Sequence, residues 1–320
     1  MINLNMLSNN EILLTIVIPT YNRADYVQKL LFNLKDQIFC YFEVFVIDGS
    51  PVENKETEFL INSVKNDFNF SITYFRFSGG AAVQRNFGIN KCKTKFVALV
   101  DDDILLDNSY FLNVIECFNL DISENIGAIC GYNSNQYLDI NKSFRWKLYK
   151  KLKLFSTYDP GKYDFIVGYP INRYLRPPHD NLVKIDFCGG GNITFIRKLI
   201  DTNIDLTFFK GYSILEDVYF MLKFSEKNNL YELGTAKCLH LHAPSGRQNG
   251  FKISEMTAIN FKYVFRNIKK NLTLYNLFRF YIVQLFQLIS LFFKFLKHPN
   301  IENLKLMFGK ILGIIKSIKY

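Results

Sequence analysis

The stretch Phe96-Val-Ala-Leu-Val-Asp-Asp-Asp103 places five apolar residues directly before three consecutive aspartates. A short apolar run that stops at polar residues is typical of a buried β-strand. Similar runs occur at residues 13–19, 42–48, 72–77 and 127–132, and segments with helical spacing occur at residues 24–34, 53–64, 79–89 and 109–118. Strands that alternate with helices in this way predict an α/β fold, with a mostly parallel sheet and helices on both faces.

The second half of the chain is less regular. Residues 133–184 are rich in aromatic side chains and turn residues, and we interpret them as loops that shape a substrate cleft. A strand over residues 187–197 is interrupted by Gly189-Gly-Gly191. A helix over residues 216–228 and a strand over residues 231–242 complete the predicted domain.

The positive charge of the chain is concentrated at one end. The 320 residues include 39 Lys and Arg and 29 Asp and Glu, a net charge of +10. Residues 261–320 contain 11 Lys or Arg and one acid, Glu302, which by itself gives +10. The preceding residues are therefore close to neutral. We expect an α/β domain over residues 1–255 and a basic helical tail over residues 256–320.

The cellular compartment follows from the cysteines and from the N-terminal residues. Six cysteines are scattered without a paired spacing, which favours reduced thiols over a disulfide framework or a zinc site. Residues 1–11 lack the charged and then apolar pattern of an export signal. Both features predict a cytoplasmic protein. The hydrophobic fraction of 49% is enough for a sizeable core and excludes a disordered chain.

Polar residues follow several of the predicted strands, where ligands of open parallel sheets bind. Thr20 and Arg23 follow the first strand, Asp48 ends the second, and Asp101 to Asp103 end the fourth. In an extended segment residues i and i+2 point the same way, so Asp101 and Asp103 would face one ligand together. Two such carboxylates need a cation between them, and Mg²⁺ or Mn²⁺ suits oxygen ligands. The alternative is that the aspartates cap the following turn.

Five motifs then resemble one known family, the family 2 glycosyltransferases with the GT-A fold. They are Ile16-Val-Ile-Pro-Thr-Tyr-Asn-Arg23, Val46-Ile-Asp-Gly-Ser50, Gly79-Gly-Ala-Ala-Val-Gln-Arg-Asn-Phe-Gly88, Leu99-Val-Asp-Asp-Asp103 and Leu215-Glu-Asp-Val218. The resemblance implies inverting transfer of a sugar from a nucleotide-diphosphate sugar, UDP- or dTDP-linked. The acceptor would be a hydroxyl of a lipid-linked or surface glycan, and residues 1–255 would be the catalytic domain.

The resemblance also assigns roles to residues. For the donor it implies Thr20, Tyr21 and Arg23 lining the nucleotide pocket, Asp48 accepting from the base, Arg85 facing the nucleotide or its diphosphate, and Asp101 near the ribose. Asp103 would bind the metal, together with Asp101, and Asp102 could exchange roles with either. The chemistry agrees, because a carboxylate only accepts hydrogen bonds and a guanidinium presents a planar fork to phosphate oxygens.

The acceptor side is assigned in the same way. Asp217 would be the general base that takes the acceptor hydroxyl proton, with Glu216 beside it. The alternative is an acidic pair favoured by a helix N-terminus. His240 would complete the metal site, His242 shares its strand face, and Arg247 would lie in a loop over the diphosphate. The family's usual Gly-Phe-Asp stretch before the acidic pair is absent, since residues 204–211 read Ile-Asp-Leu-Thr-Phe-Phe-Lys-Gly.

The basic tail predicts contact with a membrane. Residues 280–293 carry no charge, and residues 304–319 mix aliphatic side chains with lysines. This pattern favours an interfacial helix on an anionic membrane surface, through residues 261–320 and at the inner face of the cell membrane. A single membrane span and a helical hairpin that packs on the catalytic domain are the alternatives. Nucleic acid is not expected as a partner, because no known nucleic-acid module is present.

Two other functions compete with sugar transfer. A nucleotidyltransferase has a similar sheet, but a Gly-rich, Lys-bearing phosphate loop is missing after the first strand. A non-catalytic protein that binds glycans or membranes would not need the acidic groups that this chain retains.

Overall fold

The computed structural model describes residues 11–121, 125–201, 207–209, 214–243 and 249–319. The chain divides into two compact units. Unit 1 comprises residues 1–137, 178–211 and 224–246, and unit 2 comprises residues 138–177, 212–223 and 247–320. The domain boundary expected at residue 255 falls inside helix α7 (Gly250–Ile268).

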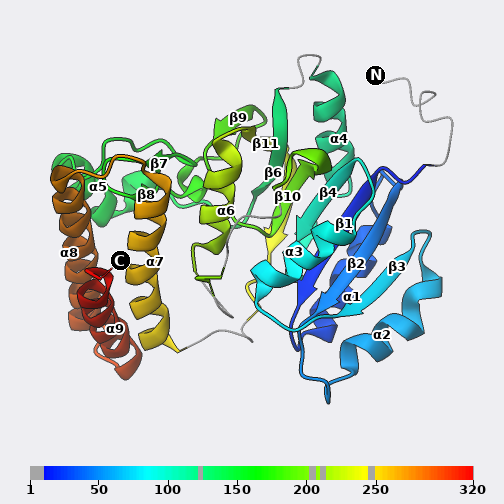
Figure 1. The fold of residues 1–320 in the computed structure, drawn as a ribbon, viewed down its shortest axis with the longest axis horizontal. Coiled ribbons are helices and arrows are strands. Elements are labelled where there is room, and N and C mark those ends of the chain that lie inside the picture. The colour runs from blue at the N-terminus through cyan, green and yellow to red at the C-terminus, as the bar shows by residue number, and fades with distance from the viewer. Residues whose placement is uncertain (1–10, 122–124, 202–206, 210–213, 244–248, 320) are drawn as a thin grey trace. The chain divides into compact units, whose positions relative to one another are not determined.

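Unit 1 is built on a nine-stranded sheet in the order β3-β2-β1-β4-β10-β6-β11-β5, with β9 also paired to β11 (Figure 1). The strands are β1 (Leu14–Thr20), β2 (Phe42–Asp48), β3 (Ile72–Arg76), β4 (Phe96–Val100), β5 (Ile104–Leu106), β6 (Ile126–Asn133), β9 (Leu182–Ile185), β10 (Asn192–Ile196) and β11 (Asn229–His240). The first four strands pair in parallel, as predicted. Strand β10 runs antiparallel between β4 and β6, so the whole sheet is mixed.

Helices cover both faces of this sheet, which confirms the predicted α/β architecture. They are α1 (Ala24–Lys35), α2 (Glu56–Val64), α3 (Ala81–Lys91) and α4 (Tyr110–Leu120), with single 3₁₀ turns at Lys65–Asp67 and Arg197–Leu199. Alternate residues of β1, Leu14, Ile16 and Ile18, belong to the core cluster that also contains the buried faces of α1 and α4. Val17 points to the other face, where it meets α3 at Gly88. Adding a Cβ to Gly88 would place it 2.4 Å from Val17 Cγ1, so this close helix–strand contact requires glycine.

Unit 2 is mainly helical. It contains α5 (Phe144–Lys151), the hairpin β7 (Tyr163–Asp164) and β8 (Tyr169–Pro170), the start of α6 (Glu216–Ser225), α7, α8 (Leu274–Lys297) and α9 (Ile301–Ser317), with 3₁₀ turns at Ile140–Lys142 and Arg173–Leu175. Residues 138–177 are not simply loops, because their aromatic side chains form a buried cluster. Trp146, Tyr149 and Phe155 pack there with Val283 of α8.

Helices α7 and α9 approach each other closely because α9 carries glycines one turn apart. Cβ atoms added at Gly309 and Gly313 would lie 2.2 Å from the Phe251 carbonyl oxygen and 2.4 Å from that of Glu255. Larger residues would therefore force the helices apart. An ion pair between Lys316 and Glu255, at 2.5 Å, joins the same two helices.

Candidate active site

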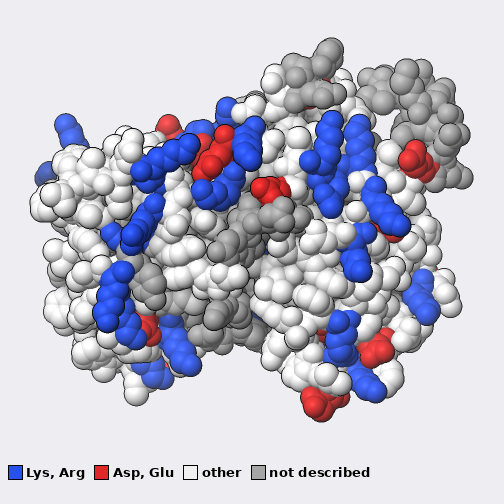
Figure 2. Space-filling model, viewed as in Figure 1, with Lys and Arg blue, Asp and Glu red and all other residues white. Residues whose placement is uncertain are grey.

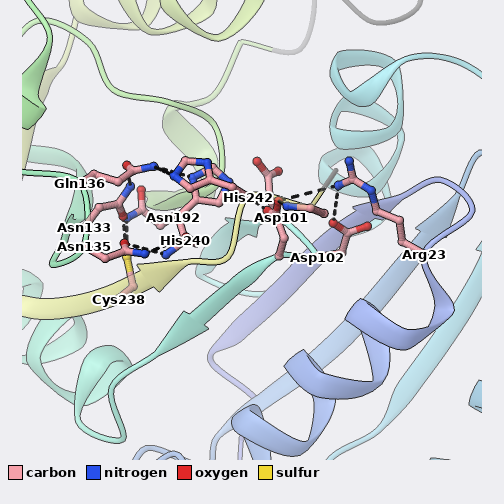
Figure 3. Close-up of polar contacts among 12 residues, drawn as sticks. Arg23, Asp101, Asp102, Asn133, Asn135, Gln136, Asn192, Cys238, His240 and His242 are labelled. Carbon is pink, nitrogen blue, oxygen red and sulfur yellow. Dashed lines mark hydrogen bonds and ion pairs between the residues drawn. The ribbon is translucent and has the colours of Figure 1, made fainter. Parts of the chain in front are cut away.

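The polar side chains of unit 1 gather at one edge of the sheet. The carboxyl ends of parallel strands meet there, and the amino end of an antiparallel strand reaches the same edge. Thr20 ends β1, the aspartates follow β4, Asn133 ends β6, and His240 ends β11. Antiparallel β10 contributes Asn192 from its first position. Chain topology thus brings these residues together from distant parts of the sequence (Figure 3).

Asp102 is the buried anchor of this edge, at 3% exposure. Thr20 Oγ1 donates to its Oδ2 over 2.7 Å, and Arg23 donates from NH1 to its Oδ1 over 3.0 Å. Burial raises the pKa of Asp102 to about 6, because it outweighs the opposite effects of Arg23 and Thr20. With both oxygens held inside the protein, Asp102 is better placed to position Arg23 than to bind a ligand.

The three aspartates lie in a turn, so the alternation expected from an extended segment was wrong. Strand β4 ends at Val100, and the Ile104 amide donates to the Asp101 carbonyl over 3.1 Å. Each carboxylate consequently has a different nearest partner, although Arg23 NH1 also lies 3.9 Å from Asp103 Oδ2. The predicted end of the strand at Val100 is confirmed, and the turn that follows it corresponds to the alternative given for the aspartates.

Asp101 pairs with Arg85 of α3, whose NH2 donates to Oδ1 over 2.7 Å. The backbone of the glycine run lies directly against this pair. A Cβ at Gly191 would fall 2.5 Å from Asp101 Oδ2, and one at Gly190 would fall 2.9 Å from Arg85 Cζ. The interruption noticed in the sequence therefore makes room for an ion pair at the predicted donor site.

Asp103 faces the end of β11. Its Oδ1 lies 3.2 Å from His240 Nε2, and its Oδ2 accepts from the Ala243 amide over 2.9 Å. Burial alone would raise the pKa of Asp103, but the hydrogen bond and charge of His240, the Ala243 amide and Arg23 together lower it. The Asp103 carboxylate is thus kept in the charged form that a cation requires.

A chain of amide side chains reaches His240 from inside the sheet, and sequence reasoning missed it. Asn192 Nδ2 donates to the Gly131 carbonyl over 3.1 Å and to Asn133 Oδ1 over 2.8 Å. Because a carbonyl only accepts, the Asn192 amino group must face Gly131, and Asn133 must present its oxygen to it. The Asn133 amino group then donates to Gln136 Oε1 over 2.6 Å.

Gln136 transmits this orientation to both histidines (Figure 3). Its Nε2 lies 2.9 Å from His240 Nδ1 and 2.9 Å from His242 Nε2. With its oxygen used by Asn133, Gln136 donates to both ring nitrogens. A neutral His240 therefore carries its hydrogen on Nε2, which faces Asp103. The signal in the sequence that could have identified Gln136 is Asn133-x-x-Gln136, directly after the end of a strand.

The residues present suit the expected divalent cation, on the condition that the hydrogen of His240 moves from Nε2 to Nδ1. Among the residues that the structure describes, no three His, Cys, Asp or Glu side chains gather as a ligand group. Magnesium-type sites often use one or two protein ligands, with waters and substrate phosphates completing the shell. Asp103 Oδ1 and His240 Nε2, 3.2 Å apart, are spaced like neighbouring ligands of an octahedral ion, which lie roughly 3 Å apart. His240 can bind a metal through Nε2 only after its hydrogen moves to Nδ1 and Gln136 turns its oxygen toward that atom.

Asp48 lies at the same edge but is fully buried. Its Oδ1 accepts from the amide and the hydroxyl of Ser50, and its Oδ2 accepts from the Tyr74 hydroxyl over 2.9 Å. The guanidinium of Arg76 lies 3.7 Å from Oδ2. Burial raises the pKa of Tyr74, and the adjacent Asp48 adds to this effect. The base contact expected of Asp48 could therefore be made equally by its partners Ser50, Tyr74 and Arg76.

The remaining predicted residues differ in their placement. Tyr21 is exposed beside the β1 end. Glu216 and Asp217 begin α6 in unit 2, where Asp217 Oδ1 accepts from the Val218 amide over 2.8 Å. This pair is described within unit 2, and its role as general base stays a prediction. Arg247 lies outside the described residues.

Comparison with known proteins identifies the family. A model of the family described as Glycosyl transferase family 2 matches residues 15–200, more than half of the chain. The chain belongs to glycosyl transferase family 2. It is a glycosyltransferase, and the GT-A fold expected from the motifs is confirmed.

Two curated relatives of this family 2 glycosyltransferase match it over short stretches. TuaG of Bacillus subtilis (strain 168), named for teichuronic acid biosynthesis, is 26% identical over 97 residues, which are 30% of this chain and 38% of TuaG. The poly(ribitol-phosphate) beta-N-acetylglucosaminyltransferase TarS of Staphylococcus aureus is 30% identical over 92 residues, 28% of this chain and 16% of TarS. The matched regions thus span well under half of either relative.

Two solved structures share the fold over nearly the whole chain. The crystal structure of S. aureus TarS 1–349 in complex with UDP-GlcNAc has a TM-score of 0.55 at 15% identity, covering 96% of this chain and 81% of that one. The mannosyltransferase PcManGT from Pyrobaculum calidifontis, in complex with GDP-Man and Mn²⁺, has a TM-score of 0.57 at 12% identity, covering 95% and 86%. At these identities the likeness establishes the fold alone.

Proposed function

We propose that this glycosyltransferase transfers a sugar, with inversion, from a nucleotide-diphosphate sugar to a hydroxyl group of a lipid-linked or surface glycan. The observation that carries the proposal is the alternation of charges at the edge of the sheet. Arg23 and Arg85 each hold a carboxylate, and Asp103 remains beside His240 with its charge stabilised. Guanidinium groups beside a charged carboxylate that contacts a histidine suit a diphosphate that arrives with a divalent cation.

The donor residues act by binding and orientation. When the donor binds, its diphosphate replaces Asp101 as the partner of the Arg85 guanidinium. Asp101 then accepts hydrogen bonds from the ribose hydroxyls. Thr20 and Tyr21 flank the nucleotide. Asp48 holds Ser50 and Tyr74 in place, and we propose that these three residues recognise the nucleotide base. The donor nucleotide would be UDP or dTDP.

A divalent cation, Mg²⁺ or Mn²⁺, would stabilise the negative charge that grows on the departing diphosphate. We propose Asp103 as its carboxylate ligand. His240 is the second ligand when its hydrogen is on Nδ1, and otherwise it donates to Asp103 and fixes the orientation of that carboxylate. The Mn²⁺ in the PcManGT complex supports this choice of ion.

Asp217 is proposed as the general base. Direct displacement at the anomeric carbon needs a carboxylate that removes the acceptor hydroxyl proton as the new bond forms. Asp217 begins a helix in unit 2, where it is partly exposed, whereas Glu216 is buried. A partly exposed carboxylate is the better choice of the two for an incoming hydroxyl.

The proposed acceptor and location rest on the relatives and on unit 2. TuaG is named for teichuronic acid biosynthesis and TarS for poly(ribitol-phosphate), and these names support our proposal of a lipid-linked or surface glycan as the acceptor. Such acceptors are made at a membrane, and we propose an anionic membrane surface as a partner of residues 261–320, on the cytoplasmic side.

Calorimetric titration of UDP with and without Mn²⁺ tests the donor site. Binding should be tighter with Mn²⁺ in the wild type, and Asp103→Asn should abolish most of that increment. The matched control is Asp67→Asn, an exposed carboxylate of a surface 3₁₀ turn, which should behave like the wild type. An undiminished Mn²⁺ increment in Asp103→Asn would remove the metal from this site.

A further inference from the structure

Helix α8 has two unlike faces. One face packs inside unit 2, where Phe280, Val283 and Gln284 are buried and Phe280 stacks on Phe265 of α7. The opposite face is exposed and apolar, and its side chains recur at helical spacing: Phe278, Leu285, Ile289, Phe292, Phe293 and Leu296. An outward face of a soluble helix is normally polar. This stripe is therefore not explained by the packing of α8.

Helix α9 repeats the pattern. Ile301, Phe308 and Ile315 are exposed and separated by seven residues, which is two helical turns. Of the 28 large hydrophobic side chains that are exposed in the described part of the chain, 12 lie between residues 274 and 318. Figure 2 shows the surface over α8 as largely free of charged side chains, with Lys and Arg along its border. We call the exposed apolar side chains of α8 the outer face.

The charges around the outer face favour one occupant. Glu302, the one acid among residues 261–320, is already paired with Lys305 at 2.7 Å. Lys294 and Lys297 at the end of α8 have no carboxylate within 4.0 Å among the described residues. A second copy of the chain would bring the same positive border against itself, because a two-fold contact joins identical surfaces. An anionic lipid surface accepts both the apolar stripe and the lysines.

The packing of α8 also decides how it meets the lipid. It is long and apolar enough to cross a membrane by length and composition, and only 17% of its most apolar window is buried. Its inner face is nevertheless held by the protein, since Lys310 of α9 donates to Gln284 and Gln287 over 2.5 and 2.6 Å. A helix that presents one face to lipid while the other packs on protein lies in the plane of the interface.

We propose that the outer face is a membrane-docking surface, with α8 lying flat in the headgroup region of an anionic bilayer and Lys297, at the border of the face, contacting lipid phosphates. This deepens the membrane partner proposed above and rests on the residues of unit 2 alone. Phe278 and Phe293, 64% and 62% exposed, insert into the apolar layer. The enzyme is thereby held at the surface that supplies a lipid-linked acceptor.

Vesicle co-sedimentation tests the proposal with the full chain. Wild-type protein should bind vesicles of equal parts phosphatidylglycerol and phosphatidylcholine, and it should bind less with added salt. Phe278→Ser with Phe293→Ser should weaken binding at least about tenfold, since each phenylalanine loses its burial in lipid. Lys297→Gln should weaken it about fivefold, because each basic residue near the surface contributes about fivefold.

The matched control replaces two equally exposed apolar residues of unit 1, Phe59→Ser with Leu120→Ser, 67% and 71% exposed, and should bind like the wild type. Equal binding by the phenylalanine variant and the wild type would overturn the proposal. So would a wild-type dimer in light scattering that becomes monomeric in the phenylalanine variant, because the occupant would then be a second copy. Calorimetry of UDP with the same proteins keeps the outcomes separate, since the donor site is in unit 1 and should be unaffected.

Discussion

The buried amine of Lys310 makes the stability of unit 2 depend on pH. Lys310 is 3% exposed, lies between α8 and α9, and burial lowers its pKa from 10.5 to about 7. The unfolded chain therefore binds one more proton than the folded chain between pH 7 and pH 10.5. The free energy of unfolding rises with pH in this window, because the unfolded chain gains less from binding its extra proton as the proton concentration falls. Below pH 7 both states are protonated and the full cost of burying the charge remains.

The size of the effect follows from the pKa difference. At about 1.4 kcal/mol per pKa unit, and with the folded amine half protonated at pH 7, stability should rise by roughly 2 kcal/mol from pH 7 to pH 9. Replacing Lys310 with Met keeps the length of the side chain and removes this dependence. The difference between wild type and Lys310→Met is the quantity to measure, since it cancels other titrating groups, including the buried amine of Lys262, whose pKa burial also lowers.

The single tryptophan gives a direct assay. Trp146 is buried in the aromatic cluster of unit 2, so its fluorescence during urea unfolding reports on this unit and not on the sheet. The wild type should gain about 2 kcal/mol relative to Lys310→Met between pH 7 and pH 9. A difference that stays constant within about 0.5 kcal/mol would mean that Gln284 and Gln287 keep the amine charged, and that the burial argument is wrong.

Three further outcomes are expected. Asp217→Asn should lower sugar transfer at least about 100-fold, because the acceptor proton loses its base, while UDP binding by calorimetry stays unchanged; full transfer activity would exclude Asp217 as the base. Gln136→Glu should move the hydrogen of His240 from Nε2 to Nδ1, visible in long-range ¹H–¹⁵N spectra, and the same tautomer in both proteins would contradict the amide chain. Gly88→Ala should destabilise unit 1 by roughly 1–3 kcal/mol in thermal or urea unfolding, because its Cβ would overlap Val17; an unchanged midpoint would show that α3 can shift freely.

The parallel half of the sheet was predictable because its signals are local. Residues 42–48 were predicted as a strand and form β2 (Phe42–Asp48), and the helix predicted over residues 24–34 is α1 (Ala24–Lys35). Buried strands are continuously apolar, and the helices that cover them have one apolar stripe, so periodicity alone locates both. The polar residues at the strand ends then follow from the topology.

Residues 133–184 were misread because the partners that order them are distant in sequence. Trp146 and Tyr149 of α5 are buried against each other and in one cluster with Val283 of α8, more than a hundred residues away. Nothing in the local pattern shows that contact. The amide chain was hidden for a similar reason, since it passes from Asn192 on antiparallel β10 to Asn133 at the end of β6, and the insertion of β10 between β4 and β6 is a property of the whole sheet.

The glycine run shows most clearly how the site departs from local rules. Glycines inside a predicted strand normally indicate a turn that needs a positive φ, but the glycines with positive φ in the described chain are Gly79, Gly161 and Gly168. Gly190 and Gly191 are instead required by space, because any side chain there would strike Arg85 or Asp101. The run lies directly before β10, which begins at Asn192, and it lets an ion pair lie against its backbone. These close contacts tie Gly190 and Gly191 to the same proposed donor site as the aspartates.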